Sequence, residues 1–223
     1  MAQFTVEFGK SATPDAPDGR LDGAAFHRNH EPIWSALAPF LTAQNGDVLE
    51  LGSGTGQHAA AYAARTPELT WWPSDINAAH LASIEAWRQH AQLPNLRAAQ
   101  RIELGDPAWS WVGERGLTAM LCINVLHISP WAVSQHLFAG AGRYLRGGGR
   151  LFIYGPFMRN GRHTAPSNEA FDASLRANNP DWGVRDVAAL DALAQDAGLL
   201  PAEISAMPAN NLVLAFARAL RQN

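Results

Sequence analysis

The chain has 223 residues, of which 47% are hydrophobic and 17% charged, and its formal net charge is −3. This length fits one α/β domain better than two, and a domain of this size buries enough surface to fold without disulfides or a metal. The small negative charge provides no basic surface for nucleic acid or anionic membranes. Cys122 is the single cysteine, so an internal disulfide is excluded, and we interpret it as a small buried hydrophobe.

The N-terminal region shows neither a secretory signal nor a membrane anchor. Its first residues lack a basic start followed by an apolar core, and no apolar stretch in the chain approaches the ~18 residues of a membrane span. We therefore expect a cytoplasmic protein. Residues 9–25 are rich in Gly, Pro, Asp and Ala, so residues 1–25 are predicted to form a mobile arm before a single domain over residues 26–223.

Helical and β-prone segments alternate along this domain. A helix is expected to open near Glu31-Pro32, because proline is tolerated in the first turn. A second helix is expected to be capped by Ser129 and to stop at Gly147, and a third to run over residues 186–197. The predicted strands are residues 47–51, 69–72, 101–104, 118–124, 150–154, 203–207 and 212–217.

The alternation of these segments indicates βαβ units and a largely parallel sheet. Residues 208–211 leave too short a connection between the last two strands for a parallel crossover, so these strands are expected to pair antiparallel. The predicted fold class is α/β, Rossmann-like, with a seven-stranded, mostly parallel sheet and a terminal antiparallel hairpin.

The strongest local motif is Glu50-Leu51-Gly52-Ser53-Gly54-Thr55-Gly56, between a buried strand and an Ala-rich helix. Glycines let the backbone pass close to a ligand, and ligands bind at this edge of open α/β sheets. A P-loop would need Lys and then Ser or Thr where Gln57-His58 stand, and a dinucleotide fingerprint would place a third glycine at position 57. S-adenosylmethionine has a cationic amino group and sulfonium, which the acid Glu50 suits. We favour this cofactor over a dinucleotide, another nucleotide or a turn without ligand.

Acids after the next two predicted strands extend this motif. Asp75 follows the second strand, where a carboxylate can accept from both ribose hydroxyls. The same position suits NAD equally, and Asp75 can also cap the following helix. Asp106, after the third strand, is placed to accept from an adenine amino group or is a loop acid. Ser53, Ile76 and Asn124 complete the expected cofactor contacts.

The motif with Asp75 and Asp106 resembles class I methyltransferases, and longer stretches resemble the DUF938 family of methyltransferase-like proteins (the methyltransferase-like protein 26 family). These stretches are Arg28-Asn29, Glu31-Pro32-Ile33, residues 53–58, Pro73-Ser74-Asp75, residues 122–131, Tyr154-Gly155-Pro156-Phe157, Pro166-Ser167-Asn168, Phe171-Asp172, residues 179–186 and residues 207–211. The resemblance covers nearly everything from residue 28 to residue 216. It implies a Rossmann-like class I methyltransferase fold that binds S-adenosylmethionine and releases S-adenosylhomocysteine, and it implies no known substrate. The family commonly reads Ala-Ser-Gly-Thr-Gly, and this chain has Gly52 in the Ala position.

Three groups of polar residues are candidates for the remaining roles. Methyl transfer needs in-line alignment, and a hydroxyl acceptor benefits from a general base. His127, after the fourth strand, and Tyr154, at the end of the fifth, are the catalytic candidates, and each is also explained by packing. The residues expected to bind the acceptor, under a polar insertion at residues 157–186, are Asn168, Arg185, Asn210 and Asn211. These polar groups alternatively bond to one another and tie the insertion down.

The N-terminal helix offers one further cofactor contact, because Arg28-Asn29 can close over the cofactor and bring a guanidinium to its carboxylate. The histidines show no tight ligand spacing, so we expect no metal. The sequence thus predicts an S-adenosylmethionine-dependent methyltransferase that acts on a small molecule and not on nucleic acid or at a membrane. The alternative is a noncatalytic cofactor-binding or interaction protein with the same fold.

Overall fold

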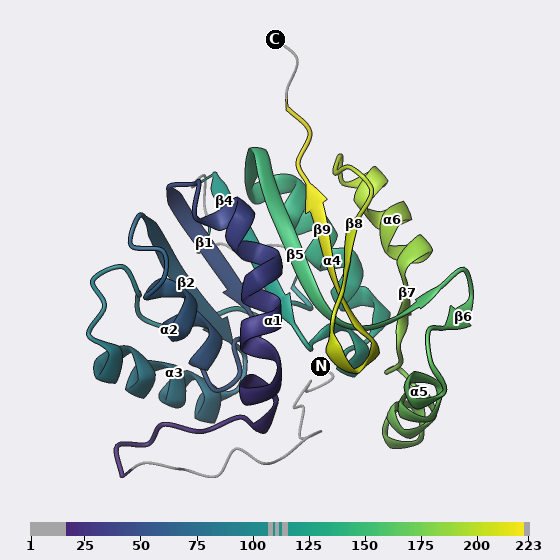
Figure 1. Cartoon of the computed structure of the whole chain (residues 1–223), viewed down its shortest axis with the longest axis horizontal. Helices are drawn as coiled ribbons and strands as arrows, with labels where there is room; N and C mark the ends of the chain where they lie inside the picture. The colour runs from purple at the N-terminus through teal and green to yellow at the C-terminus, as the bar shows by residue number, and fades with distance from the viewer. Residues whose placement is uncertain (1–16, 107–108, 110–111, 113–115, 221–223) are drawn as a thin grey trace.

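The computed structural model of the chain describes residues 17–106, 109, 112 and 116–220, and forms one open sheet covered by helices on both faces (Figure 1). Residues 1–16 of the expected arm lie outside the described residues. The strands are β1 (Gly46–Leu51), β2 (Leu69–Asp75), β3 (Gln100–Arg101), β4 (Leu117–Ile123), β5 (Leu145–Arg159), β6 (Arg162–His163), β7 (Arg185–Asp186), β8 (Glu203–Ala206) and β9 (Asn211–Ala217). The helices are α1 (Ala24–Leu41), α2 (Gln57–Ala63), α3 (Ala78–Ala91), α4 (Trp131–Tyr144), α5 (Pro166–Asn178) and α6 (Val187–Asp196), with 3-10 turns η1 (Leu126–Ile128) and η2 (Pro208–Asn210).

The main path of the sheet has the order β3-β2-β1-β4-β5-β9-β8. β1 to β5 pair in parallel, whereas β9 is antiparallel to both β5 and β8. These seven strands are the seven predicted, and the terminal antiparallel hairpin is confirmed. From β1 the strands are added in sequence on one side as β2 and β3 and on the other side as β4 and β5. All five are parallel, so the carboxyl ends of β1, β2, β4 and β5 open at one edge, and ligands bind in such sheets at the point where the strand order reverses.

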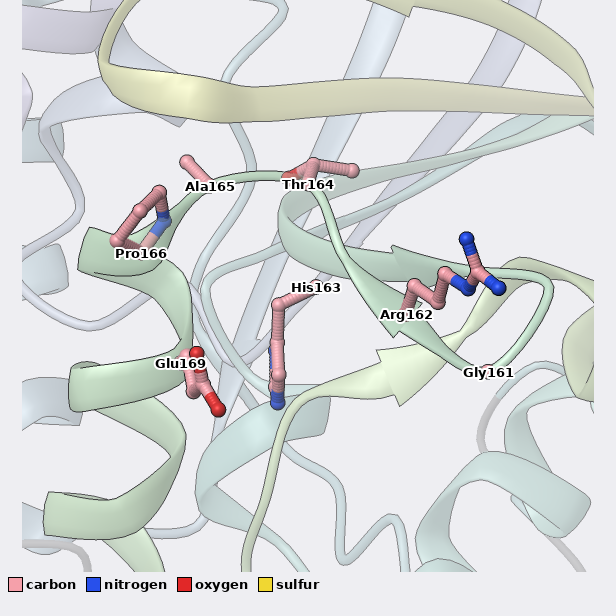
Figure 2. Close-up of a pocket in the computed structure, with 7 residues that line it drawn as sticks. All are labelled: Gly161, Arg162, His163, Thr164, Ala165, Pro166 and Glu169. Atoms are coloured by element: carbon pink, nitrogen blue, oxygen red, sulfur yellow. The ribbon is translucent and has the colours of Figure 1, made fainter.

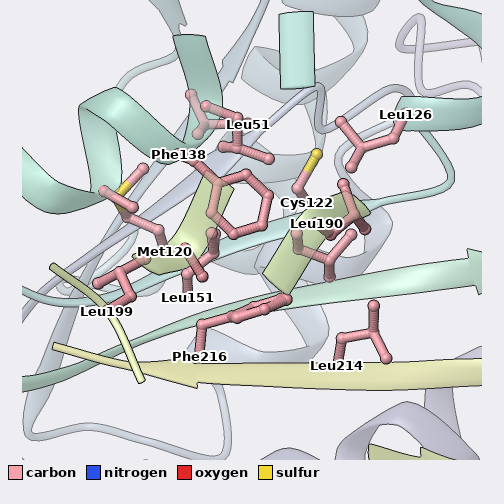
Figure 3. Packing of buried hydrophobic residues seen from close by; sticks show 14 of the residues in the cluster. Leu51, Met120, Cys122, Leu126, Phe138, Leu151, Leu190, Leu199, Leu214 and Phe216 are labelled. Carbon is pink, nitrogen blue, oxygen red and sulfur yellow. The ribbon is translucent and has the colours of Figure 1, made fainter. Parts of the chain in front are cut away.

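Two apolar cores fix the layers. One core packs α1 and α2 against the sheet, around fully buried Trp71 and Tyr62. The other packs α4 and α6 against the opposite face, and Figure 3 shows Phe138, Leu190 and Phe216 meeting there. Each strand between the cores must be apolar on both faces, as β4 is along nearly its whole length. Cys122 lies in the second core with no exposed surface and a raised pKa caused by burial, as the interpretation of a small hydrophobe expects.

Several boundaries differ from the prediction. The third strand is two residues long, since only Gln100 and Arg101 pair with β2. Pro130 rather than Ser129 caps α4, because the Ser129 hydroxyl donates backwards to the carbonyl of Val125. The glycines from 147 do not end α4, because β5 begins at Leu145.

The N-terminal helix starts earlier than expected. α1 begins at Ala24 and contains Pro32, which therefore lies inside the helix rather than in its first turn. The residues just before it are held against the next helices: Leu21 N donates to the Ser83 hydroxyl at 2.9 Å and Gly23 N to Gln57 Oε1 at 2.7 Å. The described part of the expected arm is thus attached to α2 and α3.

The polar insertion forms a small unit of its own beyond the end of the main sheet. β5 continues to Arg159 and pairs there with β6 and β7, while α5, which comes between these two short strands in the chain, lies below them in Figure 1. Leu175, Trp182 and Val184 form its apolar centre, against which Ile128 and Phe171 pack. The insertion is therefore anchored to η1 at the carboxyl end of β4.

No helix among the described residues has the length and apolar character needed to cross a membrane.

Candidate functional site

Two carboxylates lie at the carboxyl ends of adjacent parallel strands. Glu50 in β1 is 1% exposed, and its Oε2 atom has no hydrogen-bond partner among the described residues. The pKa of Glu50 is raised to about 7, chiefly by burial and also by the charge of Asp75, while hydrogen bonding by Ser53 and the amide of Ala59 partly offsets these effects. The folded chain by itself therefore disfavours the ionised form of Glu50.

Asp75, at the end of β2, is oriented by the backbone around it. Its Oδ2 accepts from the amide of Gly54 at 2.9 Å, and its Oδ1 accepts from the amide of Asn77 at 2.8 Å. His80 Nδ1 lies 3.3 Å from Oδ1, and this interaction raises the pKa of His80. Asn77 rather than Asp75 caps α3, since its Oδ1 accepts from the amide of Ala79.

The three glycines of the loop between β1 and α2 serve different purposes. All three have positive φ, with values of 67° at Gly52, 57° at Gly54 and 90° at Gly56. A Cβ at Gly52 would lie 2.6 Å from Val125 Cγ2, and one at Gly56 would lie 2.8 Å from Ile84 Cα. A Cβ at Gly54 would meet nothing within 4 Å. Packing thus explains two of the glycines, while Gly54 presents its backbone to open space beside Asp75.

The remaining predicted cofactor residues occupy varied positions. Ser53 joins the loop to β2, because its amide donates to Ser74 O at 2.8 Å and its hydroxyl accepts from Ser74 N at 3.1 Å. The carbonyl of Ile76 accepts from Arg101. Asp106 is exposed in the turn after β3. Asn124 follows β4 in the left-handed region, with φ of 58°.

The carboxylates and the open loop fit the cationic end of S-adenosylmethionine. An ammonium group beside Glu50 would supply the partner that Oε2 lacks, and its charge would favour the ionised acid. Gly54 leaves room for a ligand next to Asp75. Among the described residues, no group of three or more His, Cys, Asp and Glu side chains is arranged to hold a metal ion.

The two predicted catalytic side chains lie on opposite sides of β5, and Tyr154 lies within this strand rather than at its end. Tyr154 belongs to the core under α1 and α2. A Cβ at Gly155, the next residue, would lie 3.3 Å from His127 Nδ1 and 3.8 Å from Asn124 Oδ1. Successive residues of a strand face opposite ways, so the structure brings His127 and Asn124 together and separates them from Tyr154.

His127 is a buried neutral imidazole. It is 7% exposed, and burial lowers its pKa to about 4, helped by the charge of Arg185. Phe171 of the insertion meets its ring edge-on, with the ring centroids 5.5 Å apart. The carbonyl of His127 accepts from the amide of Gly183 at 3.0 Å. The insertion therefore closes over His127 from two points.

Tyr154 belongs to a polar group that spans three elements. Its pKa is raised by burial and lowered, in decreasing order, by hydrogen bonding with Asn29 of α1, the charge of Arg28 and hydrogen bonding with Asn211 of β9. The Oδ1 atom of the buried Asn29 lies 2.9 Å from His58 Nε2. Arg28 itself is exposed.

The other predicted acceptor residues make bonds within the protein. The Arg185 guanidinium donates to the carbonyls of Leu126 at 3.1 Å and Asp181 at 3.2 Å, and also to that of Ser129. Asn168 Nδ2 donates to Thr164 Oγ1 at 3.0 Å and to the carbonyl of Asn210 at 2.9 Å. The exposed Asn210 side chain reaches Ser167 on α5. For these three residues the structure favours the role of tying the insertion down.

The insertion also bounds a hollow of about 470 Å³ on its outer side, lined by residues 161–166 and by Glu169 (Figure 2). Within it His163 and Glu169 lie side by side, while Arg162 points away from both. None of the predicted site residues lines this hollow, so it is separate from the edge where Glu50 and Asp75 lie.

Two residues of the site were missed from the sequence. His58 stands in the quoted motif, where it was considered only as a residue that is not the lysine of a P-loop. Phe171 lies in a stretch that resembles the family and has no polar atom to indicate a role. Their contacts with Asn29 and His127 join residues far apart in the chain, which local patterns do not show.

Several solved structures with the same fold are named as methyltransferases. An O-methyltransferase family protein from Burkholderia thailandensis superposes with a TM-score of 0.75 at 18% identity, covering 89% of this chain and 58% of that one. Human N-acetylserotonin methyltransferase in complex with S-adenosylmethionine gives a TM-score of 0.62 at 17% identity, with coverage of 85% and 53%. The chain thus spans less than three fifths of these two relatives.

A third structure is matched over most of its length. The putative methyltransferase bound to the Haloferax volcanii Trm112 methyltransferase activator gives a TM-score of 0.68 at 14% identity, covering 87% of this chain and 92% of that one. These likenesses establish the Rossmann-like methyltransferase fold. The model of the family described as protein of unknown function (DUF938) matches residues 21–218, and the chain therefore belongs to the DUF938 family.

Proposed function

We propose that the protein is an S-adenosylmethionine-dependent methyltransferase that acts on a small molecule. The observation that carries the proposal is Glu50, a buried acid whose Oε2 atom has no hydrogen-bond partner among the described residues and whose pKa is raised to about 7, in the strand that leads into the open backbone of Gly54. A cationic ligand at this edge of the sheet supplies the partner that Glu50 lacks. The methyltransferase fold of its structural neighbours supports the same cofactor.

The bound cofactor would supply a methyl group on a positively charged sulfur, which leaves as a neutral thioether. Glu50 would hold the ammonium group, and Asp75 would accept from the ribose hydroxyls through lone pairs that its two amide partners leave free. Ser53 and Gly52 fix the loop that carries these contacts, and Asn124 lies at the adjoining end of β4. Ile76 and Asp106 flank the adenosine side.

His127 orients the acceptor. A neutral imidazole has one nitrogen that accepts a hydrogen bond, and the low pKa of His127 keeps that nitrogen unprotonated at physiological pH. When the acceptor is a hydroxyl, this nitrogen would take the proton that the hydroxyl loses on methylation and pass it on to water. Burial under Phe171 restricts this position to a small group.

Calorimetry tests the cofactor directly. S-adenosylmethionine and S-adenosylhomocysteine are expected to bind more tightly than NAD. Asp75→Asn is expected to lower the affinity for S-adenosylhomocysteine about 10- to 100-fold, because a hydrogen bond to a charged group is lost. Asp196→Asn removes the same charge from the exposed end of α6 and serves as the matched control. Tighter binding of NAD would refute the assignment.

Turnover separates an enzyme from a noncatalytic binding protein. The protein is incubated with a cell extract and S-adenosylmethionine labelled on the methyl group, and the metabolites, protein and nucleic acid are then separated. The proposal expects label in the metabolites, and expects His127→Gln to lose the transfer while S-adenosylhomocysteine still binds. Label confined to nucleic acid or protein contradicts the small acceptor, and binding without transfer supports the noncatalytic alternative.

A further inference from the structure

The residues just before α1 lie against the loop that carries the proposed cofactor contacts. We call residues 20–23 the strap. Trp87 Nε1 of α3 donates to the carbonyl of Leu21 at 2.9 Å, and the Arg20 guanidinium lies over the Trp87 ring, 4.8 Å from its centroid. These contacts attach the strap to α3, below which the chain passes on its way to α1 in Figure 1.

One relay of hydrogen bonds joins the strap to the loop through Ser83 of α3. The amide of Leu21 donates to the Ser83 hydroxyl at 2.9 Å, and this hydroxyl donates in turn to the carbonyl of Thr55 at 2.8 Å. Ser83 has no exposed surface, so its hydroxyl is shielded from water. The relay ends on the residue between Gly54 and Gly56.

A second relay runs through the side chain of Gln57, the first residue of α2. Its Oε1 atom accepts from the amide of Gly23 at 2.7 Å and from the hydroxyl of Thr55 at 2.9 Å. Its Nε2 atom donates to the carboxylate of Asp22, and Gln57 as a whole is buried. The strap therefore holds Thr55 at both its carbonyl and its hydroxyl.

The loop needs such contacts because its glycines do not by themselves select one conformation. Gly54 and Gly56 have φ values of 57° and 90°, and glycine populates other backbone regions about as readily. In this conformation the Gly54 amide donates to Asp75 Oδ2 at 2.9 Å. Because Thr55 lies between the two glycines, fixing it also fixes the amide that orients Asp75.

Ser83 and Gln57 make the order of the strap and the order of the loop depend on each other. When the loop leaves this conformation, the strap loses the relays that end on Thr55, and undocking of the strap releases Thr55 in the same way. A ligand that binds the ordered loop must therefore favour the docked strap. By the same linkage, the docked strap must strengthen the binding of that ligand by an equal factor.

We propose that the strap, acting through Ser83 and Gln57, positions the loop for the cofactor and is locked in place when the cofactor binds. This inference rests on the proposed function and extends its site to residues before α1. Ser83 and Gln57 are positioning residues in this arrangement, because both act through Thr55.

Trypsin measures docking of the strap directly, because it cleaves after Arg20 only when this segment is detached and extended. Cleavage of the unmodified protein is followed by mass spectrometry at low trypsin concentrations, where the rate reports the population of the open strap. The fragment that begins at Leu21 is expected to accumulate, because only the strap has opened. Saturating S-adenosylhomocysteine is expected to slow this cleavage about 10-fold or more, within the usual range of coupling between sites.

Gln57→Glu places a second carboxylate against Asp22 and is expected to undock the strap. In calorimetry, S-adenosylhomocysteine affinity should then fall by the same factor by which this ligand protects Arg20 in the unmodified protein. Adding Asp22→Asn to Gln57→Glu restores one donor and one acceptor at this contact, so cleavage rate and affinity should return to within about twofold. Ser83→Ala should speed cleavage about fivefold, as loss of one hydrogen bond does.

Gln89→Glu is the matched control for Gln57→Glu, because Gln89 is exposed on α3 and also donates to an acid, Glu85. Ser35→Ala removes an exposed hydroxyl of α1 and is the control for Ser83→Ala. Both controls should leave cleavage after Arg20 and S-adenosylhomocysteine affinity unchanged. Where urea unfolding shows that Gln57→Glu does not fold, protection of the unmodified protein by the ligand and the rate in Ser83→Ala decide.

Cleavage after Arg20 that saturating S-adenosylhomocysteine does not slow overturns the proposal, and so does faster cleavage of Gln57→Glu with unchanged affinity. A double variant that binds as weakly as Gln57→Glu assigns the loss to the loop alone and also overturns it. Degradation of the whole chain without the fragment that begins at Leu21 places cleavage in globally unfolded protein and contradicts a strap that opens by itself. If S-adenosylhomocysteine does not bind the unmodified protein, the proposed cofactor itself is refuted, and the role of the strap in binding it fails as well.

Discussion

Glu50→Gln is expected to stabilise the folded protein and to weaken its binding of the cofactor. The pKa of Glu50 rises from an ordinary 4.5 to about 7 on folding, which corresponds to about 3 kcal/mol. Because the folded state binds this proton more tightly than the unfolded state, the stability that the proton contributes is complete below pH 4.5 and is lost as the pH rises through 7. Glutamine has no proton to lose, so the variant escapes that loss.

The size of the effect follows from these two pKa values. Between pH 5.5 and pH 8.5, Glu50 is expected to remove about 2 kcal/mol from the free energy of unfolding. The difference between Glu50→Gln and the unmodified protein should therefore grow by about 2 kcal/mol over this range. For a chain of this length that change corresponds to about 4–8 °C in melting temperature.

Urea unfolding of both proteins at half-unit steps from pH 5.5 to 8.5 measures this difference. Glu85→Gln is the control, because the hydrogen bond from Arg88 lowers the pKa of Glu85 below its ordinary 4.5. The contribution of Glu85 to stability is lost only as the pH falls below that value, so the difference between this variant and the unmodified protein should stay nearly constant from pH 5.5 to 8.5. In calorimetry Glu50→Gln should lose at least about 10-fold in S-adenosylhomocysteine affinity. A stability difference that stays constant with pH, or a variant that binds the cofactor unchanged, would refute the role given to Glu50.

Three further predictions follow from the site. Gly54→Ala should cost about 1–2 kcal/mol of stability, because residue 54 has a left-handed backbone, and it should lower S-adenosylhomocysteine affinity. In Gly56→Ala the new methyl group also overlaps Ile84, so this variant should unfold at a lower urea concentration than Gly54→Ala. Equal unfolding midpoints of the two variants would contradict this. Arg185→Gln should lower the free energy of unfolding by about 2–4 kcal/mol, because it loses hydrogen bonds to backbone carbonyls, and should change cofactor affinity less than twofold. If calorimetry showed weaker ligand binding without a loss of stability, Arg185 would belong to the ligand site. His127 stays neutral to about pH 4, so a pH–rate profile should show no loss of turnover from its protonation above pH 5.

The order of elements and the cofactor loop could be predicted from the sequence because their signals are local. The apolar run of β4 and the glycines after β1 lie within a few residues of one another, and the short turn before β9 forces an antiparallel pair. The start of α1 gave no such signal, because its N-cap Gly23 makes no side-chain capping bond. β6 and β7 are two residues each and depend on the extension of β5 for pairing.

The acceptor side was harder to predict because side-chain direction there depends on tertiary contacts. His127 and Tyr154 lie at or after the ends of predicted strands, which suggested a common pocket, yet the pleat at Gly155 sends them to opposite sides. Arg185 sits in a polar stretch typical of a binding site. Its guanidinium instead satisfies carbonyls around η1 that no local pattern connects to it.

The difference between Glu50 and the Asn29–His58 pair bears on whether the protein is an enzyme or a scaffold. Asn29 and His58 satisfy each other within the protein, so folding alone accounts for them. Glu50 has an oxygen with no partner among the described residues, and its ionised form, disfavoured by burial and by the neighbouring Asp75, has a net cost of about 3 kcal/mol above pH 7. A scaffold that bound nothing would be more stable with glutamine at this position. Because a ligand with a positive charge offsets this cost and packing does not, the arrangement around Glu50 favours a cofactor site in use.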